Sequence, residues 1–256
     1  MSEKWKTAIT NIEPNKVQLR GYSIDALMGK VSFAQVVYLA IMGKMPDENV
    51  GKIIDMILVS SVDHGVTPPS ALAARTVAST GASLNAALSA GILSINRWHG
   101  GAIEDSMRVY AEVVEKAEQE NIGITESAEI IVSEYKLRKE KIKGFGHRIH
   151  NKDPRQIKLY ESAKKLGISG KYVEASEAIR EIFLKNGKNL PINVDGAIGA
   201  ILCEIGFPPV LANAFFMIAR MPGLTAHIYE EWQREKPMRR IEPSAWEYDG
   251  ETDQQI

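Results

Sequence analysis

Cysteine is almost absent from this sequence, with Cys203 alone among 256 residues. One cysteine forms no intramolecular disulfide and builds no cysteine-based metal cluster. Long hydrophobic runs are lacking as well, because no apolar stretch approaches the roughly 18 residues of a membrane-spanning helix. The first residues, Met1–Lys6, have no apolar core of the kind found in secretion signals. We therefore expect a cytoplasmic protein with no membrane partner.

An excess of charge of either sign is also missing. The 31 Lys and Arg residues nearly balance the 32 Asp and Glu residues, and the formal net charge is -1. No bulk electrostatic field then favours nucleic acid or an anionic membrane as a partner. Hydrophobic residues make up 45% and charged residues 25% of the chain, which is ordinary for a soluble globular protein. The length fits one large domain, or two smaller domains that share a core.

Helical periodicity covers almost the whole chain, and the alternation typical of strands is nearly absent. Ser32 and Asp47 are suitable N-cap residues before apolar segments, and Gly43 is a helix stop. We expect about ten helices, no β-hairpin and an all-α fold. The expected helices cover residues 33–42, 48–60, 70–79, 83–95, 103–121, 125–138, a segment that opens at Asp153-Pro154, 173–185, 194–205, 208–220 and 223–234.

Three of the five histidines lie in breaks between helices, each beside glycine: His64, His99 and His147. Glycine lets the backbone turn sharply and lets a ligand approach closely. A single loop histidine is most often a surface residue, but three in the same setting favour a functional site. His150 and His227 lack that setting, so we expect them to be structural or exposed.

A metal site is not expected. The gaps between the loop histidines are far longer than the ligand spacings typical of zinc sites, and cysteine ligands are lacking.

Three arginines and one aspartate are further candidates. Arg155 follows Asp153-Pro154 at a helix start, Arg220 closes an apolar segment, and Arg240 comes 20 residues later. A guanidinium binds a carboxylate through two parallel hydrogen bonds, although an arginine at a helix end often only complements the helix dipole. Asp195 stands at a helix start, where it serves as an N-cap or, in an apolar pocket, as an acid–base group.

A basic run covers residues 134–143. We interpret it first as a solvated helix end and second as a surface that faces phosphate groups.

The motifs in their order resemble the citrate synthase superfamily. The resemblance runs from Leu19 nearly to the end of the chain. The motifs that carry it are Leu19–Ile24, Ser32-Phe33, Gly43–Pro46, Asp63-His64-Gly65, His99–Ala102, Gly144–Arg148 with Asp153-Pro154-Arg155, Asn193-Val194-Asp195, Arg220–Gly223 and Arg240.

The compact length narrows this resemblance. Citrate synthases of the family are considerably longer and carry extra helices between the region of Pro46 and the first active-site histidine, whereas here one helix leads directly to Asp63-His64. The chain therefore resembles citryl-CoA lyase and the C-terminal citryl-CoA lyase module of ATP-citrate lyase. Two positions depart from the synthase pattern: Pro68 stands where many synthases have asparagine, and Gly196 where they often have an aromatic residue.

The resemblance implies a helical fold with a large domain, residues 1–101 and 208–256, and a small domain, residues 102–207. Gly100-Gly101 and Gly206 would be hinge positions whose movement closes the site against water. In the family the last arginine, here Arg240, reaches in from a neighbouring subunit, so the resemblance implies a homodimer or a larger homo-oligomer.

The same resemblance implies cleavage of citryl-CoA to acetyl-CoA and oxaloacetate. His147 would act as acid–base at the tertiary hydroxyl, His99 would bind the thioester oxygen, and Asp195 would protonate the enolate carbon. The residues expected to hold the oxaloacetate portion are His64, Arg155, Arg220 and Arg240. The residues expected to contact CoA are Lys143, Gly144, Gly146, Arg148 and Lys188.

Two alternatives remain open at this point. The same residues would serve a compact citrate or 2-methylcitrate synthase, which condenses an acyl-CoA with oxaloacetate and then hydrolyses the thioester. A catalytically silent paralogue, acting as a subunit or regulator, is the other alternative. No permanently bound cofactor is expected, because CoA enters as part of substrate and product. A citryl-CoA synthetase is the expected functional partner.

Overall fold

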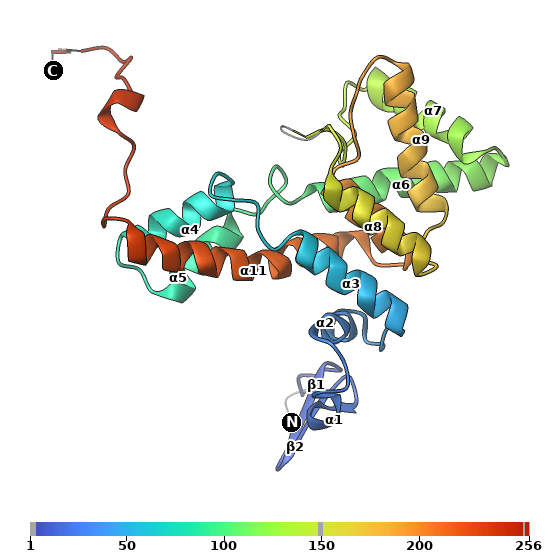
Figure 1. Cartoon of the computed structure of the whole chain (residues 1–256), viewed down its shortest axis with the longest axis horizontal. Helices are drawn as coiled ribbons and strands as arrows, with labels where there is room; N and C mark the ends of the chain where they lie inside the picture. The colour runs from blue at the N-terminus through green and yellow to red at the C-terminus, as the bar shows by residue number, and fades with distance from the viewer. Residues whose placement is uncertain (1–3, 148–150, 253, 256) are drawn as a thin grey trace. The chain divides into compact units, whose positions relative to one another are not determined.

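The computed structural model describes residues 4–147, 151–252 and 254–255. Figure 1 shows the chain, which divides into two compact units. Unit 1 comprises Met1–Asp63 and Ile95–Arg220, and unit 2 comprises His64–Ser94 and Met221–Ile256. These limits differ from those of the large and small domains that the resemblance implies, and that division stays a prediction.

Helices make up most of the described chain, which confirms the all-α class expected from the sequence. None of the helices in the described ranges combines the length and the apolar character needed to cross a bilayer. The helices are α1 Ile24–Leu27, α2 Phe33–Met42, α3 Glu48–Ser60, α4 Pro69–Ser79, α5 Leu84–Leu93, α6 Ala102–Glu120, α7 Ile124–Leu137, α8 Pro154–Lys165, α9 Lys171–Lys185, α10 Val194–Glu204 and α11 Pro209–Arg234, followed by a short 3-10 turn, Pro243–Ala245.

The limits of α2 and α3 are those expected from their caps. The Ser32 hydroxyl accepts a hydrogen bond from the backbone N–H of Gln35 at 3.2 Å, and Gly43 ends α2 in the left-handed conformation at φ 74°. The Asp47 carboxylate accepts a hydrogen bond from the N–H of Val50 at 2.8 Å. Both caps satisfy backbone groups that a helix end leaves without a helical partner.

The expectation of no β-hairpin is wrong. The strands β1 Thr10–Glu13, β2 Lys16–Leu19 and β3 Tyr22–Ser23 form an antiparallel sheet in the order β1-β2-β3. Its turns contain Asn15 at φ 63° and the pair Arg20 and Gly21 at φ 50° and 86°. Each strand has at most four residues, so the alternation is too short to stand out against the helical pattern.

The expected break between helices 208–220 and 223–234 is also wrong. The segment is one helix, α11, with Pro222 inside it. Proline removes one helical hydrogen bond and kinks a helix, but packing on both sides of it maintains the helix here. Phe215 and Ala219 are buried before Pro222, and Leu224 and Ile228 are buried after it.

In unit 1 the core surrounds α10. This helix is apolar on all sides, and every residue of Gly196–Leu202 is buried against α6, α8 and α9. A helix enclosed in this way has a fixed N-terminus, and Asp195 is its second residue.

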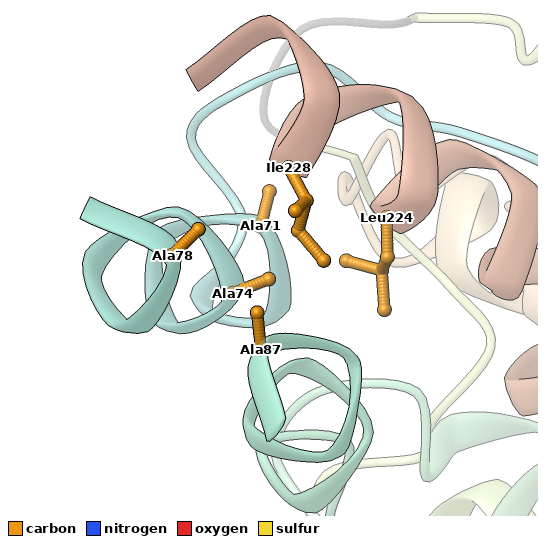
Figure 2. Close-up of a cluster of buried hydrophobic side chains, with 6 residues drawn as sticks. All are labelled: Ala71, Ala74, Ala78, Ala87, Leu224 and Ile228. Atoms are coloured by element: carbon orange, nitrogen blue, oxygen red, sulfur yellow. The ribbon is translucent and has the colours of Figure 1, made fainter. Parts of the chain in front are cut away.

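In unit 2 the core consists mainly of alanine, as Figure 2 shows. Ala71, Ala74 and Ala78 of α4 and Ala87 of α5 pack with Leu224 and Ile228 of α11. Small side chains let helix backbones approach closely, and the larger Val77, Leu88 and Ile92 pack around the cluster.

Replacement of Leu224 by alanine tests this packing. Leu224 has no exposed surface, so Leu224→Ala leaves a cavity and should lower the free energy of unfolding by about 2–5 kcal/mol. The control is Leu93→Ala, whose side chain is 77% exposed and whose removal should change stability by about 0.5 kcal/mol or less. Urea unfolding followed by circular dichroism measures both values. Equal losses for the two variants would contradict this packing.

Candidate active site

The loop that carries His147 lies against the segment before α10. The Gly144 carbonyl accepts a hydrogen bond from the N–H of Asn193 at 3.0 Å, and the Gly146 N–H donates to the Pro191 carbonyl at 2.7 Å. The Asn193 side-chain amide also donates to the Gly146 carbonyl at 3.0 Å. Main-chain hydrogen bonds therefore hold residues 144–146 beside residues 191–193 and place the His147 and Asp195 segments side by side.

Gly144 and Gly196 permit this close approach. A Cβ atom on Gly144 would lie 2.8 Å from the Gly196 Cα, and one on Gly196 would overlap the Gly144 carbonyl oxygen. Gly144 also has φ 86°, which disfavours other residues. An aromatic residue at position 196, as in many synthases, does not fit this arrangement of the two segments. The close approach of the two segments thus explains why position 196 is glycine and not an aromatic residue.

Asp153 joins the start of α8 to the start of α10. Its side chain is fully buried and caps α8 by accepting the Arg155 N–H at 3.0 Å. The Arg155 guanidinium also donates to it, at 3.0 Å from Nε and 2.8 Å from Nη2. The second carboxylate oxygen accepts the Val194 N–H at 3.1 Å. Asp153 therefore holds Arg155 beside Asp195, a role that the sequence analysis missed.

The charge state of Asp153 follows from these contacts. Burial by itself raises the pKa of this carboxyl group, but the hydrogen bonds and positive charge of Arg155, together with the Val194 N–H, lower the pKa below its ordinary value. Asp153 is therefore an anion near neutral pH and pairs with a cation that it also orients.

Asp195 is not the N-cap of α10. Asn193 is the cap, and its side-chain oxygen accepts the Gly196 N–H at 3.1 Å. The Asp195 Oδ1 atom is buried and has no hydrogen-bond partner within the described residues. Burial raises the pKa of Asp195 to about 6, although the positive charges of Arg155 and Arg220 lower it, and the charge of Asp153 adds to the rise. A carboxyl group with this pKa exchanges protons near neutral pH, as a general acid or base requires.

Arg220 lies inside α11 and not at a helix end, so the interpretation as a dipole-complementing residue is wrong. Its side chain is buried, Nε donates to the Ser61 carbonyl at 3.0 Å, and the guanidinium stacks 4.6 Å from the Phe216 ring centroid. Burial lowers the pKa of Arg220, while the charges of Asp63 and Asp195 oppose that shift. A buried cation with this fixed orientation is suited to a carboxylate ligand.

His99 stands in a tight loop whose backbone closes on itself. The Asn96 N–H donates to the His99 carbonyl at 2.8 Å, and the His99 N–H donates to the Asn96 carbonyl at 2.9 Å. The imidazole meets the edge of Phe216, with ring centroids 5.7 Å apart and ring planes at 85°. Phe216 therefore contacts both His99 and Arg220. Sequence reasoning missed it, although it precedes Arg220 by one helical turn.

Lys143 contacts the His99 loop through an aromatic ring. Its Nζ lies 4.7 Å from the ring centroid of Trp98, and the Arg97 guanidinium lies 5.1 Å from the same centroid. The Trp98 side chain is 79% exposed, so two cations and an indole form a surface beside His99. Lys188 is exposed and lies after α9.

Unit 1 contains five of the expected site residues, His99, His147, Arg155, Asp195 and Arg220. The charges of Arg155 and Arg220 act on Asp195, and Phe216 contacts both Arg220 and His99. Two other expected site residues, His64 before α4 and Arg240 after α11, belong to unit 2. Arg148 and His150 lie outside the described residues, and His227 is half-buried on α11. Across the described ranges, no three His, Cys, Asp or Glu side chains gather as a metal ion would need.

Asp195→Asn should stabilise the protein at neutral pH. The pKa of Asp195 is about 6 in the folded chain and near 3.8 when unfolded, so the native state loses stability as pH rises from about 4 through 6. Asparagine does not ionise. The free energy of unfolding of the variant should therefore exceed that of the wild type by roughly 1–3 kcal/mol at pH 7, and the two should be nearly equal near pH 4. Urea titrations at both pH values measure this, with the exposed Asp55→Asn as control. A lower free energy of unfolding for Asp195→Asn than for the wild type at pH 7 would contradict the raised pKa of Asp195.

Solved structures include a close relative of this fold. Citryl-CoA lyase from Hydrogenobacter thermophilus superposes with a TM-score of 0.90 at 42% identity, and the match covers 99% of this chain and 98% of that one.

Sequence relatives carry synthase names. Citrate synthase of Haloferax volcanii is 32% identical over 82% of this chain and 53% of its own length. Citrate/2-methylcitrate synthase of Bacillus subtilis is 33% identical over 74% of this chain and 50% of its own length. The chain thus spans about half the length of these relatives. A family model described as the C-terminal domain of citrate synthase matches residues 40–242. This match covers the loops of His64, His99 and His147 and the start of α10, and the chain belongs to the citrate synthase family.

Proposed function

We propose that the protein is a citryl-CoA lyase, which cleaves citryl-CoA to acetyl-CoA and oxaloacetate. The match to the Hydrogenobacter thermophilus citryl-CoA lyase is the observation that carries this proposal. That match extends over 98% of the other chain, whereas the citrate synthase of Haloferax volcanii is matched over 53% of its length. The coverage of both chains, together with the 42% identity, supports the lyase as the first candidate.

The proposed cleavage is a reversed Claisen condensation. His147 accepts the proton of the tertiary hydroxyl, the oxygen becomes the carbonyl of oxaloacetate, and the electrons of the breaking carbon–carbon bond form the enolate of acetyl-CoA. His99 donates a hydrogen bond to the thioester oxygen as negative charge develops there. Asp195 then gives its proton to the enolate carbon. A carboxyl group with a pKa of about 6 supports this role, because it holds or releases a proton near neutral pH.

The oxaloacetate portion of the substrate carries carboxylates, and the proposed site supplies cations for them. Arg155 and Arg220 lie near Asp195, and both lower its pKa through their positive charge. Asp153 orients Arg155. The Ser61 carbonyl and the Phe216 ring hold Arg220. His64 and Arg240 complete the proposed set.

The CoA portion would lie along the loop before His147. The proposed contacts are Lys143 and the backbone of Gly144 and Gly146, with Arg148 and Lys188 for the phosphates. The position of Lys143 over Trp98, next to His99, supports a phosphate-facing role for this lysine.

Assembly and closure belong to the same proposal. The protein would act as a homodimer in which Arg240 serves the neighbouring site, and residues 102–207 would close on the rest of the chain to exclude water. Exclusion of water matters because a lyase must release acetyl-CoA without hydrolysis of the thioester. No resident cofactor is part of the proposal, and the substrate would come from a citryl-CoA synthetase.

A compact citrate or 2-methylcitrate synthase is the second candidate. The named relatives of Haloferax volcanii and Bacillus subtilis favour it, at 32% and 33% identity. Such an enzyme would use the same His99, His147 and Asp195 in the direction of condensation and would then hydrolyse the thioester.

An assay of product balance separates the candidates. Citryl-CoA is supplied, oxaloacetate is followed through NADH oxidation by malate dehydrogenase, and acetyl-CoA and free CoA are quantified in the same tube. A lyase gives equal oxaloacetate and acetyl-CoA with little free CoA. Free CoA together with citrate would instead indicate the synthase. Asp195→Ala is the matched control, and its turnover should fall by roughly 10²–10⁴-fold. No reaction of the wild type, or normal turnover of the variant, would contradict the proposal.

A further inference from the structure

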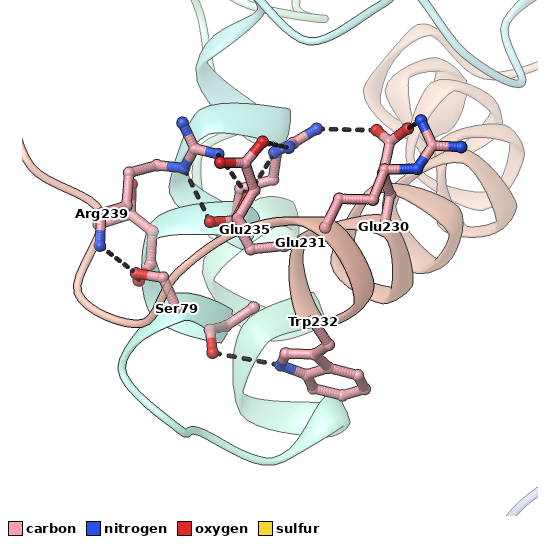
Figure 3. Close-up of polar contacts among 10 residues, drawn as sticks. Ser79, Glu230, Glu231, Trp232, Glu235 and Arg239 are labelled. Atoms are coloured by element: carbon pink, nitrogen blue, oxygen red, sulfur yellow. Dashed lines mark hydrogen bonds and ion pairs between the residues drawn. The ribbon is translucent and has the colours of Figure 1, made fainter.

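Unit 2 contains a buried cluster of ion pairs that the proposed reaction does not use (Figure 3). Arg75 of α4 is 6% exposed and contacts three glutamates of α11 and the segment after it. Its Nε lies 2.7 Å from Glu231, its Nη1 lies 3.0 Å from Glu230, and its Nη2 lies 3.7 Å from Glu235. The cluster therefore joins α4 to the C-terminal end of α11.

Glu231 is the centre of this cluster. It is 2% exposed, and Arg239 binds it in bidentate form, with Nε at 2.9 Å from one oxygen and Nη2 at 2.6 Å from the other. Burial raises the pKa of Glu231, but the hydrogen bonds and charges of Arg239 and Arg75 lower it below its ordinary value. A buried ion pair of this kind adds little net stability over an apolar core, and its best-attested use in proteins is to favour one arrangement over others.

The geometry that it specifies is the path of the chain after α11. The Met238 N–H donates to the Ser79 carbonyl at 2.8 Å, and the Arg239 N–H donates to the Ser79 hydroxyl at 3.1 Å. Met238 has φ 64°, so the chain turns sharply there. Every described residue from Arg240 onward is exposed. Met238 and Arg239 thus anchor the chain to α4 and α11, and Arg240 directly follows them.

We propose that the cluster of Arg75, Glu231 and Arg239 positions Arg240 for a carboxylate of the substrate. This inference rests on the proposed function, which gives Arg240 that ligand. A guanidinium on a mobile terminal segment would lose conformational freedom on binding, whereas one attached to an anchored backbone loses less. Glu231, Arg75 and Ser79 are positioning residues in this scheme, and they act through Arg240 without contact to substrate.

The first test measures the anchor itself. In Glu231→Gln one oxygen of the bidentate contact becomes a donor that faces Arg239, so the Met238 and Arg239 amides should exchange hydrogen faster than in the wild type. Ser79→Ala removes the acceptor for the Arg239 N–H, along with a hydrogen bond to the Thr76 carbonyl within α4, and should show a smaller increase in a chain that folds normally. Arg234→Gln is the matched control, because Arg234 lies on the same helix and pairs with Glu230 at 2.8 Å, whereas Arg239 pairs with Glu231. Unchanged exchange in both Glu231→Gln and Ser79→Ala would overturn the anchor.

The second test connects the anchor to Arg240. Calorimetry with oxaloacetate as the probe should give a Kd about 10–100-fold higher for Glu231→Gln than for the wild type and for Arg234→Gln. Arg240→Ala should weaken binding as well, and Glu231→Gln should add nothing further in that background, because two changes that act through one group are not additive. Additive losses of oxaloacetate affinity in the double variant would overturn the proposal. A Kd of Glu231→Gln equal to that of the wild type would overturn it as well. Neither readout depends on turnover, so failure of the lyase assay is a separate result.

Discussion

The Asp153 carboxylate is the contact on which the rest of the site depends. It is fully buried, and it binds Arg155 at the start of α8 and the Val194 N–H at the start of α10. One anion thus fixes both Arg155 and the start of the helix that carries Asp195. The loop of His147 is then aligned by main-chain hydrogen bonds to residues 191–193, which precede the same helix. If the carboxylate lost its charge, Arg155 and the α10 terminus would lose their shared support.

Both units use a buried carboxylate to orient an arginine or the chain beside it. In unit 1 Asp153 holds Arg155, and in unit 2 Glu231 holds Arg239 between α4 and the segment that carries Arg240. Such pairs specify geometry more than they add stability. Asp195 differs from both, because its Oδ1 has no hydrogen-bond partner in the described chain and burial outweighs the nearby positive charges. The pKa of Asp195, about 6, follows from this lack of a hydrogen-bonded cation.

The sequence predicts the local features of this fold well and the long-range ones poorly. Caps and stops lie within a few residues, so the limits of α3 after Asp47 are as expected. The hairpin at residues 10–23 was not predicted, because its strands are too short for a clear alternation. A break was expected between residues 220 and 223, but packing continues α11 through Pro222. The candidate site residues come from loop motifs and family resemblance. Asp153 was noted only as the opening of a helix and as part of a family motif, because its contact with Val194 spans 41 residues and leaves no local pattern.

The pKa of Asp195 in the wild type and in Asp153→Asn tests the central role of Asp153 most directly. Carbon-13 NMR of the aspartate carboxyl groups over pH 4–8 measures both values. We expect a pKa of about 6 in the wild type. A lower value is expected in the variant, because the variant lacks the negative charge of Asp153, which raises the pKa of Asp195 in the wild type. A pKa that is unchanged or higher in Asp153→Asn would contradict the account.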